Sequence, residues 1–233
     1  MTGPFFGIVP GTFTHSHILN HHRYHNGISD VYSTAGYPRD SIVSFCRYIC
    51  IWFLYASNVS TLIHFIQEGR LLAACELALA TLYYVAIVTV LWLISPLWAL
   101  VSIGWAFVEG NVLLAMVNWV WHMSVDEGMT PEVVSTTIVR GQEFIFSEEY
   151  HAVHHASPGL HWSRYGEMYK SGKDKGSYAR AVIFQDCNLF VLWGAVVFKD
   201  YDLIQKLVHD PDGELKDIDV KELVKSRLQR TIW

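Results

Sequence analysis

The sequence lacks several features that would place it in a common soluble class. It has few cysteines and no C-x-x-C pair. We therefore expect the cysteines to be small packing residues in a reducing or membrane setting, with no disulfide framework. The net charge of −5 gives no electrostatic footprint for nucleic acid. Residues 1–14 lack both a basic start and a long apolar run, so we expect no secretory signal peptide. The four cysteines are Cys46, Cys50, Cys75 and Cys187.

Lysine and arginine are absent from residues 71–139, and two long apolar runs occupy most of this gap. Residues 71–94 contain one charge, Glu76, and residues 97–121 contain only Glu109. At about 1.5 Å per residue each run reaches roughly 35 Å as a helix, which is enough to cross a bilayer. The chain is 52% hydrophobic with a mean hydropathy of +0.23. These patterns predict an all-α integral membrane protein built on a transmembrane helical hairpin, with a tight turn at Ser95.

Three further segments complete the organisation. In residues 41–67 the uncharged part, between Arg47 and His64, is slightly shorter than the roughly 17 residues of a span, so we predict an interfacial helix. Residues 181–198 are apolar but short, and we expect them to pack against the membrane surface or the core. After them, charged and apolar residues alternate, with a turn at 210–213 before an amphipathic helix. We therefore predict a membrane domain, residues 1–198, and a charged cytoplasmic C-terminal tail, residues 199–233.

Eight of the 12 histidines fall in two short clusters. The first contains H-x-x-x-H-H, and on a helix its residues four apart, such as His21 and His25, would share a face. The second contains H-x-x-H-H, whose three rings one helical turn would aim at a common point. Neutral imidazole binds iron, copper, nickel or zinc, and six imidazoles exceed what one tetrahedral zinc ion needs. We predict a metal centre bound by His17, His21, His22, His151, His154 and His155.

The predicted topology also brings a pair of residues outside the two clusters to the same side of the membrane. Two clusters that serve one centre must be separated by an even number of crossings, which one hairpin provides. The basic residues lie before and after the hairpin, so both clusters, which form a histidine-rich cap, are expected to face the cytoplasm. The second run ends at the same side with Asn118 and His122, four residues apart on one helix face.

These motifs resemble the membrane-bound di-iron fatty acid desaturases and their hydroxylase relatives. The run His21-His22-Arg-Tyr-His-Asn26, with Asp30 after it, resembles the family's second histidine box, and residues 151–155 resemble the third. The resemblance implies that His122 is a further ligand and that Asn118 contacts the metal through water. It covers roughly residues 5–165. The family's first box has no counterpart before His17, which indicates an N-terminally truncated form, an incomplete gene model or a short non-catalytic relative, unless His15 or His25 substitutes.

The resemblance implies a cofactor, a reaction and partners. Two irons per site would use O2 and two electrons to introduce a double bond into a fatty acyl lipid, with electrons from a b-type cytochrome or a ferredoxin. A lipid hydroxylase or a carotenoid ketolase, which share the boxes, and a non-catalytic membrane protein remain alternatives. The expected location is the endoplasmic reticulum membrane in a eukaryote or the inner membrane in a bacterium.

Three acidic residues outside the boxes are also candidates. Glu109 lies mid-span with Asn111, where an ionisable group is expensive, so it either serves the site or makes a helix–helix contact. Glu148 and Glu149 precede the third box, where they either accept a hydrogen bond from a ligand histidine or form a solvated pair.

Overall fold

The computed structural model describes residues 3–125, 137–140, 147, 149–173, 182–185, 187–210, 213 and 215–233. Within these residues the chain is mostly helical, as predicted, and contains one small sheet that the sequence did not predict. The contacts divide the chain into two compact units. Unit 1 comprises Met1–Arg23, Ser29–Tyr32 and Arg47–Ala115, and unit 2 comprises Tyr24–Ile28, Ser33–Cys46 and Met116–Trp233.

The regular elements of unit 1 are all helices in its described residues, and some of these helices continue into unit 2. The first half of the chain contains a 3-10 helix Gly3–Phe6, a π-helix Thr12–His21, α1 His22–Tyr24, α2 Ile42–Ala56, α3 Val59–Gln67, α4 Leu71–Ile94, α5 Pro96–Ala99, a second π-helix Leu100–Trp105 and α6 Ala106–Trp121.

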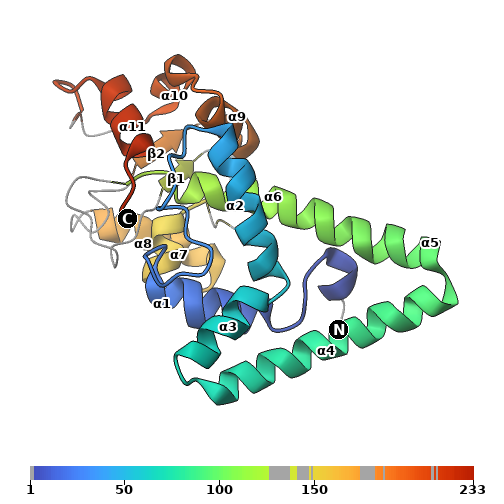
Figure 1. Ribbon diagram of the computed structural model, residues 1–233. Helices are drawn as coiled ribbons and strands as arrows, with labels where there is room; N and C mark the ends of the chain where they lie inside the picture. Colours follow the sequence, from blue (N-terminus) through green and yellow to red (C-terminus); the bar gives the residue numbers. More distant parts are fainter. Residues whose placement is uncertain are drawn as a thin grey trace. The chain divides into compact units, whose positions relative to one another are not determined.

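The hairpin is the largest part of unit 1 (Figure 1). Helix α4 has 24 residues, and the continuous helix Pro96–Trp121 has 26, so both are long and apolar enough to cross a membrane. In hydrocarbon a helix satisfies its own backbone hydrogen bonds, which is why such runs become helices. Ser95 begins the second helix by accepting a hydrogen bond from the Trp98 N–H at 3.4 Å, and proline occupies the first helical position.

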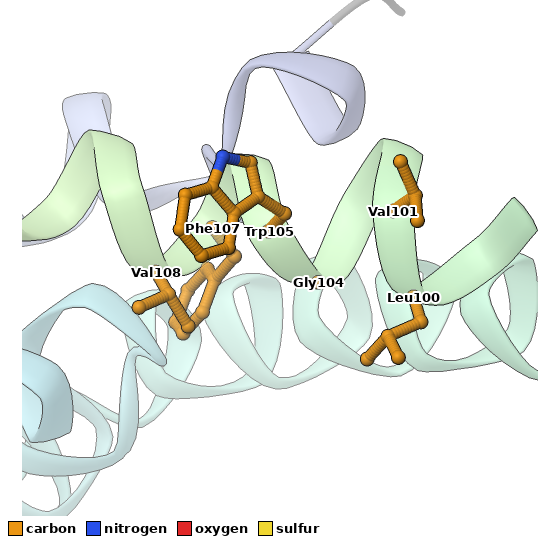
Figure 2. Close-up of a pocket in the computed structure, with 6 residues that line it drawn as sticks. All are labelled: Leu100, Val101, Gly104, Trp105, Phe107 and Val108. Carbon is orange, nitrogen blue, oxygen red and sulfur yellow. The ribbon is translucent and has the colours of Figure 1, made fainter. Parts of the chain in front are cut away.

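An apolar hollow of about 770 Å³ lies along the second helix of the hairpin (Figure 2). Its lining comes from consecutive turns of one helix, around the second π-helix. Side chains of this kind suit contact with lipid tails and provide no group for chemistry. The lining residues are Leu100, Val101, Gly104, Trp105, Phe107 and Val108.

The interfacial segment differs from the sequence-based expectation of one helix. Residues 42–67 form α2 and α3, which meet at an angle of 71°. The bend occurs at Asn58, which has a left-handed φ of 66°. Its amide Nδ2 donates to the Pro10 carbonyl at 3.1 Å, and its Oδ1 accepts from the Thr12 hydroxyl at 2.7 Å. These bonds offset the cost of the left-handed conformation, which favours glycine or asparagine.

The N-terminal segment packs closely on α6 within unit 1. Gly7 has a φ of +73°, and a Cβ there would lie 2.3 Å from the Ala106 carbonyl oxygen, so only glycine fits. Asn111 donates to the Gly7 carbonyl at 3.0 Å and accepts from the Trp52 indole at 3.2 Å. Asn111 therefore makes a packing contact, whereas Glu109 is exposed along the span.

Unit 2 contains the small sheet and the remaining helices. Strands β1, Thr137–Arg140, and β2, Val182–Gln185, pair in parallel, with Ile138 opposite Ile183. The apolar segment 181–198 thus divides into a strand and a helix. The helices of unit 2 are α7 His151–Ala156, a 3-10 helix Trp162–Arg164, α8 Tyr165–Lys173, α9 Leu189–Val197, α10 Tyr201–Leu207 and α11 Val220–Gln229.

The C-terminal helices pack within unit 2. Val224 and Leu228 of α11 are buried, whereas Ile218 is 45% exposed. Tyr201 of α10 donates a hydrogen bond to Asp40, and the Gln229 amide donates to the same carboxylate at 2.8 Å. Residues 211 and 212 of the expected turn lie outside the described part of the chain.

Candidate metal centre

This chain's first box, His17, His21 and His22, is the one that resembles the family's second box, and its second box, His151, His154 and His155, resembles the family's third. The first box lies in unit 1 at the end of the π-helix. In a π-helix hydrogen bonds run from i to i+5, so residues five apart come closest in register. His17 and His22 are such a pair, and their Nε2 atoms lie 3.2 Å apart. The ring centroids of His17 and His21 are farther apart, 5.3 Å, than those of His17 and His22, 4.7 Å. The winding, which differs from the expected α-helix, thus turns His17 and His22 toward each other.

Two rings of the first box are held through Nδ1. His21 Nδ1 lies 2.5 Å from Asp30 Oδ2, and both side chains are fully buried. The other oxygen of Asp30 accepts the Tyr32 N–H at 3.2 Å. His17 Nδ1 lies 3.0 Å from the Tyr32 hydroxyl. A partner at Nδ1 fixes the ring and leaves Nε2 as the ligand atom, which is the usual arrangement around a metal-binding histidine.

Three imidazoles converge in unit 2. His151 Nε2 lies 2.8 Å from His122 Nε2 and 3.1 Å from His155 Nε2. One nitrogen carries at most one proton, so hydrogen bonding alone cannot satisfy all three. With metal–nitrogen bonds of about 2.1 Å, neighbouring ligands at right angles lie about 3 Å apart. These three buried side chains therefore fit one metal ion.

The rings of the second box are also supported on their far sides. His154 Nδ1 lies 3.0 Å from the Tyr165 hydroxyl, and burial lowers the pKa of His154 to about 4. Its imidazole is therefore neutral at physiological pH, which is the form that binds a metal. His155 Nδ1 lies 3.3 Å from His25 Nδ1, and the Trp121 ring stacks on His151 at 4.5 Å.

His122 follows directly after α6, at the end of the second apolar helix. Its N–H donates to the Asn118 carbonyl at 3.1 Å, and its own carbonyl accepts from the Thr34 hydroxyl at 2.9 Å. Thr34 is fixed in turn by its N–H, which donates to Asn26 Oδ1 at 2.7 Å. Asn118 is buried one turn before His122, as the motif predicts, and its contact through water stays a prediction.

Several expectations for neighbouring residues need correction. His25 does not continue the helix of the first box, because α1 ends at Tyr24 and His25 has a left-handed φ of 49°. Its ring contacts His155, whereas His15 contacts Glu76, Nε2 to Oε2, at 3.0 Å. Glu149 is fully buried, so the solvated alternative is wrong for it, and Glu148 lies outside the described residues.

No pattern in the sequence pointed to the hydroxyls that contact the candidate ligands. Tyr32, Tyr165 and Thr34 lie in no box, and tyrosine is abundant in this chain. Of the side chains other than histidine that contact these histidines, only Asp30 was indicated by the sequence, as the acidic residue that follows the first cluster. The aromatic rings Tyr32 and Tyr55 pack at 3.8 Å between centroids, so the hydroxyl that contacts His17 belongs to a packed aromatic group.

Taken together, the long apolar helices and the buried imidazoles define a class: helical, membrane-associated proteins with a histidine site that could hold a metal. A comparison with family models refines this class. The model described as fatty acid desaturase matches residues 1–185, so the chain belongs to the fatty acid desaturase family. No curated protein and no solved structure matched the chain. Helices α9, α10 and α11 lie beyond the matched residues.

Proposed function

We propose that the protein is an O2-dependent lipid desaturase that introduces a double bond into a fatty acyl chain. The observation that carries the proposal is the convergence of the Nε2 atoms of His122, His151 and His155 at 2.8 and 3.1 Å. Such a set could hold a metal ion between the rings. Family membership makes acyl-chain oxidation the reaction to test first.

The proposed centre holds two irons. Its ligands are His17, His21, His22, His122, His151, His154 and His155, with Asn118 acting through water. The spacing of the histidines in each box supports this set, and in the first box it brings the Nε2 atoms of His17 and His22 close together. The chain also links the two boxes, because only two residues separate His22 from His25, and the His25 ring contacts His155. Bound iron would supply the activation of O2 that no side chain can perform.

The protein's own groups would orient the ligands and keep water out. Asp30, Tyr32 and Tyr165 contact rings at Nδ1, and burial lowers the pKa of His154, which favours its neutral imidazole. The two apolar helices support a membrane location, where an acyl substrate is available. We further propose that both boxes face the cytoplasm, where a b-type cytochrome or a ferredoxin delivers electrons. The arginines and lysines on that side of the hairpin support this orientation.

Product analysis tests the proposal. The full chain would be expressed with a ferredoxin or b-type cytochrome system, and its lipids compared by mass spectrometry with those from His155→Ala. His161→Ala is the matched control, because His161 is exposed and contacts Ser163. We expect a new acyl double bond with wild type and His161→Ala, and none with His155→Ala. A hydroxyl product would assign a hydroxylase and a keto-carotenoid a ketolase. Iron-loaded protein without any product would indicate a non-catalytic relative.

A further inference from the structure

Arg39 is a fully buried cation whose donors all reach backbone carbonyls. A guanidinium has five N–H groups, and here five carbonyl oxygens accept from it. The Nε–H donates to Met123 at 3.1 Å, and one Nη2–H donates to Arg227 at 2.7 Å. The remaining acceptors are the carbonyls of Ala35, Tyr37 and Arg230. A buried charge that is satisfied in this way fixes the position of every segment it contacts.

Arg39 contacts the chain on both sides of a ligand candidate, through its side chain and through its backbone carbonyl. Met123 directly follows His122, and its carbonyl is held by the Arg39 side chain. On the other side, the Trp119 indole donates to the Arg39 carbonyl at 3.0 Å. The His122 carbonyl itself is held by Thr34, from the same loop as Arg39. The end of α6 around His122 is thus fixed from one loop.

The C-terminal helix, α11, contacts the Arg39 side chain through backbone carbonyls at its end. Arg227 and Arg230 lie at the C-terminal end of α11, where carbonyls lack helical partners and a cation is favoured. The Arg227 carbonyl also accepts the Val125 N–H at 3.3 Å. Beyond the helix, Trp233 packs so closely on Gly36 that a Cβ there would lie 2.3 Å from the indole nitrogen. The C-terminus is therefore tied to the loop that carries Arg39.

We propose that Arg39 and α11 position His122 for metal binding, so that a segment outside the family match supports the metal centre. Arg39 is a positioning residue, because it acts through the backbone of residues 122–125 and does not touch the imidazole cluster. The inference rests on the proposed function only in naming His122 as a ligand. The packing of the C-terminal segment around Arg39 does not depend on iron.

Hydrogen–deuterium exchange on the full chain tests the inference without metal. Arg39→Met removes all five donors, and Arg39→Lys keeps the charge with at most three donors. Val197→Ala is the control, because it removes the same buried packing from α9 and leaves Arg39 and α11 in place. We expect amide exchange in residues 122–125 to rise about tenfold in Arg39→Met and less in Arg39→Lys. The Val197→Ala variant should show no such selective rise.

A second readout follows the ligand geometry. The same variants would be loaded with Co²⁺, and the visible absorption of the bound ion compared at equal amounts of folded protein. We expect altered bands in both Arg39 variants and unchanged bands in Val197→Ala. Unchanged exchange and unchanged bands in the Arg39 variants would overturn the inference, and Arg39→Lys decides the matter should Arg39→Met not fold. Wild type that takes up no Co²⁺ would count against the proposed function, while the exchange result still judges the role of Arg39.

Discussion

The residues behind the candidate ligands help to explain how so many imidazoles can be buried together. His21, His17 and His154 each have a hydrogen-bonding group at Nδ1, from a carboxylate or a tyrosine. The Asp30 carboxylate only accepts, so it favours the tautomer of His21 that presents Nε2 as an acceptor, while the tyrosine hydroxyls orient the rings of His17 and His154. The arrangement favours metal binding by preorganisation, because the ligands need little reordering when the ion arrives.

Replacement of Asp30 tests this preorganisation at the residue scale. In Asp30→Asn the carboxylate charge opposite His21 Nδ1 is lost, and we expect metal affinity to fall about 10- to 100-fold. Competition with a chelator measures the affinity. Asp202→Asn is the control, since Asp202 is exposed and pairs with Lys221 at 2.7 Å. Equal affinities for the Asp30 and Asp202 variants would show that Asp30 does not support a ligand.

At the scale of elements, long uniform patterns were predictable and local backbone choices were not. The hairpin follows from composition alone, so its two helices were expected within a residue of their observed ends. The π-helix and the bend at Asn58 depend on contacts with distant residues such as Pro10 and Thr81. Strands β1 and β2 have four residues each and pair across more than 40 residues of chain, so neither showed a period of its own.

The packing of the N-terminal segment on α6 gives a prediction about glycine. Gly7 and Gly69 have nearly equal φ values, +73° and +71°, but only Gly7 has atoms within 4 Å of an added Cβ. Gly69→Ala should cost about 1 kcal/mol from the left-handed conformation alone. Gly7→Ala should cost about 3 kcal/mol, since a steric overlap is added. Thermal unfolding in detergent compares them, and equal losses would contradict the close contact with Ala106.

The contact between α10 and Asp40 gives a prediction about pH. Burial, with the hydrogen bond to Asp40, raises the pKa of Tyr201 to about 12. An unfolded tyrosine ionises near pH 10, so the stability from this contact is complete below pH 10 and is lost as the pH rises to 12. Tyr201→Phe should cost about 1 kcal/mol at pH 7, and the difference should shrink above pH 10. Tyr83→Phe, at an exposed tyrosine, is the control for the melting curves. If the stability difference between wild type and Tyr201→Phe stays constant up to pH 12, the hydrogen bond from Tyr201 to Asp40 does not have this role.

For the whole molecule, one expectation concerns topology. The sequence predicted one hairpin between two histidine boxes, and the part of the chain that the structure describes contains two helices long enough to span a membrane, or three spans if α2 and α3 form one bent span. Membership in the desaturase family was also predictable, since the boxes carry it. The support for His122 from Arg39 and α11 could not be predicted, because it joins residues nearly 200 positions apart through backbone carbonyls.

Membrane orientation can be measured with single cysteines in a chain whose native cysteines are replaced. Ser95→Cys reports the turn of the hairpin, and Ser163→Cys reports the region after the second box. In bacterial cells we expect a membrane-impermeant maleimide to label Ser95→Cys from outside and Ser163→Cys only after permeabilisation. Labelling of both positions from the same side would mean that the second helix of the hairpin does not cross the membrane between them, and would contradict the proposed topology.

The most direct test of the central claim is the iron content of the purified full chain, measured per folded molecule by elemental analysis. The account predicts about two irons in wild type and in the His161→Ala control, and at most about one in His155→Ala. Wild type with one iron or none, or His155→Ala with two, would contradict the claim that the two histidine boxes together hold a di-iron centre.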